Sequence, residues 1–308
     1  MSLQVGNIST LPSRLLLATD LTDLQHTLPV AIDHALQYRA ELRLIHVLPD
    51  VNSSDTNPSL LVHSDREGVQ HHAETILEDA AKKARDAGVQ CAWTMRTCHV
   101  ADTIRQVVQE WGPDHVIIGS HGSQKAQQEL LGSVAESIFR EVEVPVLAIG
   151  PEVQHDGKFF SKDARVLFAT ALNRESRSVA ESVLKFARIH QADLTMLHVL
   201  PEVAKAHPSA SRVRSYAERM FQEILSGISA QETRPACMIE RGHVAETILR
   251  VAGQGKFDLI LLGAVSGASF RREIVPGTAY GVISRAPCPV LVLKEGTLLG
   301  TSGLPAAP

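Results

Sequence analysis

The chain has 308 residues, of which 44% are hydrophobic and 21% charged, and its formal net charge is −4. This length and composition fit a globular protein with room for two domains, and the charge argues against a nucleic-acid or anionic-membrane partner. No apolar run approaches the roughly 18 residues of a membrane helix, and no secretory signal is visible, so we expect a cytoplasmic protein.

Strand and helix patterns alternate along the first half. Continuous runs of Val, Ile and Leu are followed by amphipathic periodicities, and Ala87-Gly88 is typical of a helix end. We expect strands at residues 15–18, 42–47, 89–96, 115–118 and 144–149, and helices at about 24–39, 66–87, 100–111 and 133–141.

The second half repeats the first. LTMLHVLPEV (194–203) matches LRLIHVLPDV (42–51), and HVAETILRVA (243–252) matches HVADTIRQVV (99–108). The offset falls from 152 to 144 residues, which indicates a loop insertion after His46 in the first half. The repeated pattern predicts strands at 166–169, 194–199, 236–240, 258–262 and 288–293, and helices at about 174–190, 209–228, 244–253 and 278–285.

We therefore predict two homologous α/β domains, at 12–150 and 163–294, followed by a mobile tail at 295–308. Apolar strands that alternate with helices imply a parallel sheet covered on both faces. Ligands of such sheets bind beyond the carboxyl ends of the strands, where the strand order reverses.

A glycine-rich loop follows the fourth predicted strand. Its spacing, Gly119-x2-Gly122-x9-Gly132-Ser133, is neither a Walker loop nor the GxGxxG dinucleotide fingerprint. Glycine nevertheless allows a ligand to approach the backbone closely, and a helix that begins at Gly132-Ser133 would favour an anion at its N-terminus. The alternative is that these glycines serve only as turns.

The ordered set of motifs resembles the universal stress protein family. The glycine loop is accompanied by Ala18-Thr19-Asp20 after the first strand, His46-Val47 after the second, His99-Val100-Ala101 at a helix start and Val144-Pro145-Val146 in the last strand. The resemblance covers residues 14–294 and occurs in both halves.

This resemblance implies two tandem, doubly wound domains with five parallel-type strands in the order 3-2-1-4-5. It also implies ATP or another adenine nucleotide in the first domain, with Mg²⁺ carried on the phosphates. Asp20 would meet the adenine, with Ala18, Thr19 and Val47 around the nucleoside. Backbone groups of the glycine loop would approach the ribose and phosphates, and the residues implied there are Ile118, Gly119, Gly122, Gly132, Ser133 and Val134.

The second half departs from the motif. Ala171 stands where the first half has Asp20, and the first glycine interval is lengthened to Gly263-x3-Gly267. One extra residue displaces the following loop by about 3.5 Å, which is more than a hydrogen bond tolerates. We expect this half to bind ATP weakly or not at all.

Three functions remain open from the sequence. The first is a nucleotide-dependent stress-response regulator with an unidentified protein partner. The second is a slow ATPase or an autophosphorylating enzyme, for which His121, Ser123 and Ser133 are the candidate residues. The third is a scaffold that needs no nucleotide.

The fifth strand would form an edge in this strand order, and edges invite pairing. The two halves could therefore associate as an intramolecular pseudo-dimer, and two chains as a homodimer. The strand-end histidines His46 and His198 are interpreted as packing residues rather than ligands. The four cysteines show no zinc-ligand spacing, so we expect no protein-bound metal and interpret them as buried or half-buried thiols.

Overall fold

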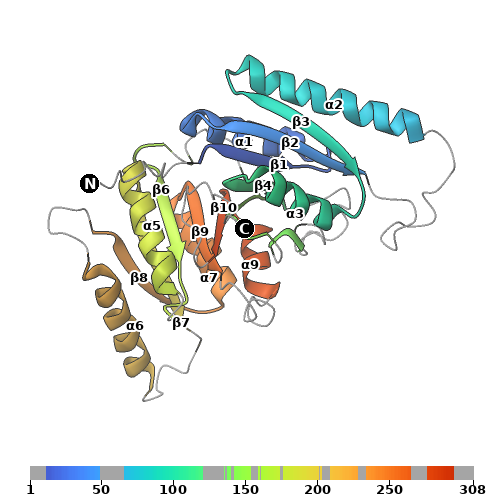
Figure 1. The fold of residues 1–308 in the computed structure, drawn as a ribbon. Helices are drawn as coiled ribbons and strands as arrows, with labels where there is room; N and C mark the ends of the chain where they lie inside the picture. The colour runs from blue at the N-terminus through green and yellow to red at the C-terminus, as the bar shows by residue number, and fades with distance from the viewer. Residues whose placement is uncertain are drawn as a thin grey trace, which may run out of the picture.

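The computed structural model describes residues 12–48, 66–120, 135, 137–139, 142–153, 159, 161–173, 176–200, 202, 209–227, 234–264 and 276–294. Strands and helices alternate in both halves (Figure 1). The first half contains β1 (Arg14–Ala18), α1 (Leu24–Tyr38), β2 (Glu41–Leu48), α2 (Arg66–Asp86), β3 (Cys91–Thr97), α3 (Val100–Trp111), β4 (His115–Gly119) and β5 (Val146–Ile149).

The second half repeats this order. It contains β6 (Arg165–Ala169), α5 (Ser176–His190), β7 (Asp193–Leu200), α6 (Ser209–Leu225), β8 (Ala236–Arg241), α7 (Val244–Gly255), β9 (Leu259–Ala264), α9 (Pro276–Ile283) and β10 (Val290–Lys294). The predicted α/β class and the tandem arrangement are therefore confirmed. Of the predicted helix at 133–141, the structure describes only residues 135 and 137–139, and these are helical.

Two boundaries differ from the sequence expectation for local reasons. The predicted strand at 144–149 begins at Val146, because Pro145 has no N–H to donate, although its carbonyl accepts a bond from Val116 N–H at 3.0 Å. The predicted strand at 89–96 begins at Cys91, because Val89 N–H returns to the Ala84 carbonyl at 3.0 Å. That bond closes α2 around Gly88, whose φ is +93°, as the predicted C-cap requires.

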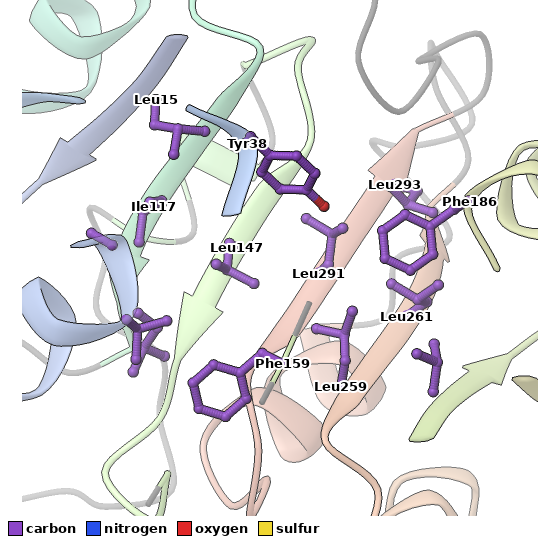
Figure 2. Packing of buried hydrophobic residues seen from close by; sticks show 14 of the residues in the cluster. Leu15, Tyr38, Ile117, Leu147, Phe159, Phe186, Leu259, Leu261, Leu291 and Leu293 are labelled. Atoms are coloured by element: carbon purple, nitrogen blue, oxygen red, sulfur yellow. The ribbon is translucent and has the colours of Figure 1, made fainter. Parts of the chain in front are cut away.

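All ten strands belong to one sheet, in the order β3-β2-β1-β4-β5-β10-β9-β6-β7-β8. Each half keeps the order 3-2-1-4-5 with parallel neighbours, and the halves meet where β5 and β10 pair antiparallel. The sheet thus differs from two separate five-stranded sheets, because Leu147 faces Leu291 in a ladder that crosses between the halves. Figure 2 shows these two leucines side by side, with the ring of Tyr38 close by.

The core lies on both faces of this sheet, and each face is shared by the two halves. One apolar cluster gathers buried residues of α1, α2, α5 and α6 with one face of the strands. The other gathers residues of α3, α7 and α9 and residues 135, 138, 139 and 142 with the opposite face. Leu15, Leu16 and Leu17 of β1 are all fully buried, which explains the continuous apolar runs of the strands.

A buried polar cluster interrupts the apolar contact between the halves. His34 Nε2 lies 2.9 Å from Nδ1 of His115, and the Tyr38 hydroxyl lies 3.1 Å from Nε2 of His190 in the other half. The Tyr38 and His34 rings meet edge-on at 5.0 Å between centroids. This chain of rings therefore links the first half to the second by directional contacts.

Burial sets the protonation of these histidines. It lowers the pKa of His115 and of His190 to about 4, and lowers that of His34 well below its usual range. For His115, the neighbouring Asp114 opposes the shift and His190 adds to it. The three rings are therefore neutral at pH 7, while the same residues in the unfolded chain take up protons near pH 6.5.

Acidification from pH 7.5 to pH 5 should consequently lower the free energy of unfolding, because these histidines bind protons in the unfolded chain and remain neutral in the folded protein. His115 alone accounts for a loss on the order of 2 kcal/mol at pH 5. In a His115→Leu variant, which carries the residue of the equivalent position Leu259, the pH dependence should be shallower. Urea unfolding at both pH values measures this.

The control is His71→Gln on the exposed face of α2, which should keep the wild-type pH dependence. If the free energy of unfolding of His115→Leu depended on pH as steeply as that of the wild type, the buried cluster would not govern acid stability.

Candidate functional site

The strand order reverses between β1 and β4. From β1 the chain passes to β2 and β3 on one side of the sheet, and it returns to β4 and β5 on the other. Ala18 at the end of β1 stands in register with Ile45 of β2 and with Ile118 of β4. The carboxyl ends of these three strands therefore meet at one edge, and this is where parallel sheets hold ligands.

Several of the predicted nucleotide residues come together at this edge. Ala18, Val47 and Ile118 are buried in one apolar cluster, and Thr19 N–H continues the β1–β2 ladder to the Ile45 carbonyl at 3.0 Å. Gly119 ends β4 beside them. Gly122, Gly132, Ser133 and Val134 lie outside the described residues.

Asp20 starts the loop after β1 with its side chain exposed. Its Oδ1 accepts hydrogen bonds from Thr22 N–H at 2.9 Å and from the Thr22 hydroxyl at 2.7 Å. These bonds form a local turn of the kind that Asp favours, and they fix the carboxylate at the sheet edge.

His46 anchors the end of β1 from the neighbouring strand. Its Nδ1 lies 2.9 Å from the Thr19 carbonyl, so this nitrogen carries the proton and donates. The repeat preserves the contact, since His198 Nδ1 lies 2.9 Å from the Thr170 carbonyl. Both histidines thus hold a strand end in place, as the sequence interpretation proposes.

Asp23 is the most buried carboxylate of this edge, and it is absent from the site residues predicted from the sequence. Asp23 stands at the N-cap of α1, yet its side chain does not cap the helix. Its Oδ1 accepts a hydrogen bond of 2.6 Å from the Thr19 hydroxyl, and the backbone of Gly119 donates to the same carboxylate. The spacing Thr19-x3-Asp23 was the available signal, but by itself it indicates only a helix start.

Desolvation is the main influence on this carboxylate. Burial raises the pKa of Asp23 to about 6, and the nearby charge of Asp20 pushes it in the same direction. The hydrogen bonds from Thr19 and Gly119 oppose the rise. Asp23 therefore changes charge close to neutral pH, unlike an ordinary surface aspartate.

The second half keeps part of this arrangement. Thr170 accepts a hydrogen bond from Leu172 N–H at 3.2 Å, as Thr19 does from Leu21. Ala171 replaces Asp20, however, and Glu175, which directly precedes α5 as Asp23 precedes α1, lies outside the described residues. The apolar side chain of Val179 stands against Gly263, the counterpart of Gly119.

Comparison with known proteins identifies the fold's relatives. The model of the Universal stress protein family matches residues 13–150 and 164–294. The chain belongs to the universal stress protein family.

Three relatives show how far this similarity extends. A universal stress protein structure from Archaeoglobus fulgidus DSM 4304 superimposes with a TM-score of 0.65 at 23% identity, over 92% of this chain and 98% of that one. Universal stress protein Slr1230 of Synechocystis is 24% identical over 226 residues, which is 72% of each chain. Universal stress protein YxiE of Bacillus subtilis is 28% identical over 145 residues, covering 44% of this chain and 98% of the relative.

No group of three or more His, Cys, Asp or Glu side chains within the described ranges could hold a metal ion. Likewise, in the described part of this universal stress protein no helix is long and apolar enough to cross a membrane. The four cysteines are free, and the expectation of buried or half-buried thiols is wrong for Cys98 and Cys237, which are exposed beyond the end of β3 and on the edge strand β8.

Gly119 should tolerate a methyl group poorly, because that group would overlap Oδ2 of Asp23 and stand 3.0 Å from its Cγ. We expect Gly119→Ala to lower the free energy of unfolding by about 1–3 kcal/mol. The matched Gly263→Ala should cost less, since its new methyl would stand 3.3 Å from Val179 Cγ1. Chemical unfolding of the two variants measures the difference.

Adding Asp23→Ala to Gly119→Ala should relieve part of the penalty, which a double-mutant cycle detects as a non-additive free energy. Additive effects would contradict the close packing of Asp23 on Gly119.

Proposed function

We propose that this universal stress protein is a nucleotide-dependent regulator that holds ATP, or another adenine nucleotide, in its first half. The observation that carries the proposal is the edge formed by β1, β2 and β4. There Thr19, Asp20 and Gly119 stand at the strand reversal, and the full spacing Gly119-x2-Gly122-x9-Gly132-Ser133 follows in the sequence.

Each part of the edge suits one part of the ligand. Asp20 is exposed and can accept a hydrogen bond from the adenine amino group. The nucleoside would pack against the buried apolar cluster around Val47 and Ile118. The phosphates would lie against the glycine loop, with Gly122, Gly132, Ser133 and Val134 as their backbone and hydroxyl donors and with Mg²⁺ on the phosphates. No protein ligand for the metal is needed in this arrangement.

The second half is proposed to serve as a structural partner. Ala171 has no side-chain atom that could accept a hydrogen bond from the adenine amino group as Asp20 can, and the lengthened glycine interval displaces the loop. The antiparallel pairing of β5 with β10 supports the view that the two halves act together as an intramolecular pseudo-dimer. The state of the nucleotide would then be transmitted to a regulatory partner through one continuous sheet.

Calorimetric titration of nucleotide-free protein with ATP and Mg²⁺ tests the proposal, and we expect about one ATP per chain. Asp20→Ala should weaken binding about tenfold, the equivalent of one lost hydrogen bond to a charged group. Gly122→Val should abolish binding, because its side chain fills the space of the phosphates.

Gly267→Val in the second half is the matched control and should leave binding intact. Two ATP per chain would show that the second half also binds, and no binding at all would refute a nucleotide-dependent function.

A further inference from the structure

Asp23 connects the two strands between which the chain order reverses. Its Oδ1 accepts a hydrogen bond from the hydroxyl of Thr19, the residue after β1. The same carboxylate accepts a hydrogen bond from the backbone of Gly119, the last residue of β4. Leu21 N–H donates in turn to the Thr19 hydroxyl oxygen at 2.9 Å. One half-buried side chain therefore sets the spacing between β1 and β4 and the path of the loop that carries Asp20.

The two halves differ at this glycine. The counterpart of Gly119 is Gly263, which is covered by a branched apolar side chain, that of Val179. Glu175, which directly precedes α5 as Asp23 precedes α1, lies outside the described residues. A carboxylate therefore packs on the glycine in the half with the complete nucleotide motif, and an apolar side chain packs on it in the other half.

We propose that Asp23 is a positioning residue of the nucleotide site and that its ionisation is linked to occupancy, so that the protein takes up a proton when an adenine nucleotide binds. The inference rests on the proposed function, which it deepens. Asp23 contacts both strand ends as a half-buried carboxylate, and a nucleotide would bring further negative charge to the same edge.

The electrostatic argument follows from the groups around Asp23. Asp20 in the adjoining loop is a second acidic group, His46 of β2 is turned to the Thr19 carbonyl, and β4 contributes the backbone of Gly119. Burial and Asp20 already place the pKa of Asp23 at about 6, so little additional negative potential is needed to protonate it near neutral pH. A phosphate at this edge supplies such a potential and raises the pKa further.

Linkage fixes the direction of the effect. A group whose pKa rises on binding favours the complex as the pH falls, because the bound form holds the proton more tightly. For a rise of about one pKa unit, the affinity should increase on the order of fivefold between pH 7.5 and pH 5.5.

Calorimetric titration with ATP and Mg²⁺ at these two pH values tests the inference on the full chain, in two buffers of different ionisation enthalpy. We expect the affinity of the wild-type protein to increase from pH 7.5 to pH 5.5 by a larger factor than the affinity of Asp23→Asn. The asparagine can keep the contact with Thr19 but cannot take up a proton, and the titration of the nucleotide itself is common to both proteins.

A second measurement does not depend on the variant folding well. The ¹³C signal of the Asp23 carboxyl, followed by NMR against pH, should show a higher midpoint in the nucleotide-bound protein than in the free protein. Equal pH dependence in wild type and Asp23→Asn, or an unchanged Asp23 midpoint, would overturn the inference while leaving nucleotide binding intact. Absence of binding at both pH values would instead refute the proposed function, and the linkage with it.

Discussion

The antiparallel contact of β5 with β10 is the constraint on which the rest of the molecule depends. Five-stranded sheets of this order end in an apolar edge strand, and an uncovered edge of that kind promotes association with other chains. Here Val146, Leu147 and Ala148 pair with Val292, Leu291 and Val290, and all six are buried. The ladder removes both edges at once and makes each face of the sheet a single shared core.

Symmetry at this junction is approximate, and the departures from it are informative. The halves are related closely enough to repeat the strand order and the strand-end histidine contacts. They differ at the candidate site, where Asp20 of one half is replaced by Ala171 in the other and the first glycine interval of the second half is one residue longer. The duplicated domain has thus kept its packing residues while residues at its strand ends have changed.

Much of this architecture follows from the sequence because it depends on local pattern. Runs such as Leu15–Leu17 predict buried strands, and the repeat of LRLIHVLPDV as LTMLHVLPEV predicts two domains of one kind. The contacts of Asp23 and of His115 could not be predicted in this way. Each depends on a partner about 80 to 100 positions away, Gly119 for Asp23 and His34 for His115, and a single sequence contains no periodicity that connects such residues.

The ring contact between Tyr38 and His190 has a consequence for how such a protein can evolve and assemble. In the register that aligns α1 with α5, an offset of 152 residues, Tyr38 and His190 occupy equivalent positions. Two copies of the first half would bring two tyrosines together at this point, and two copies of the second half would bring two imidazoles together, so neither pairing reproduces the contact. The halves have become complementary rather than interchangeable, and this complementarity favours the pairing of a first half with a second half over the pairing of two identical halves.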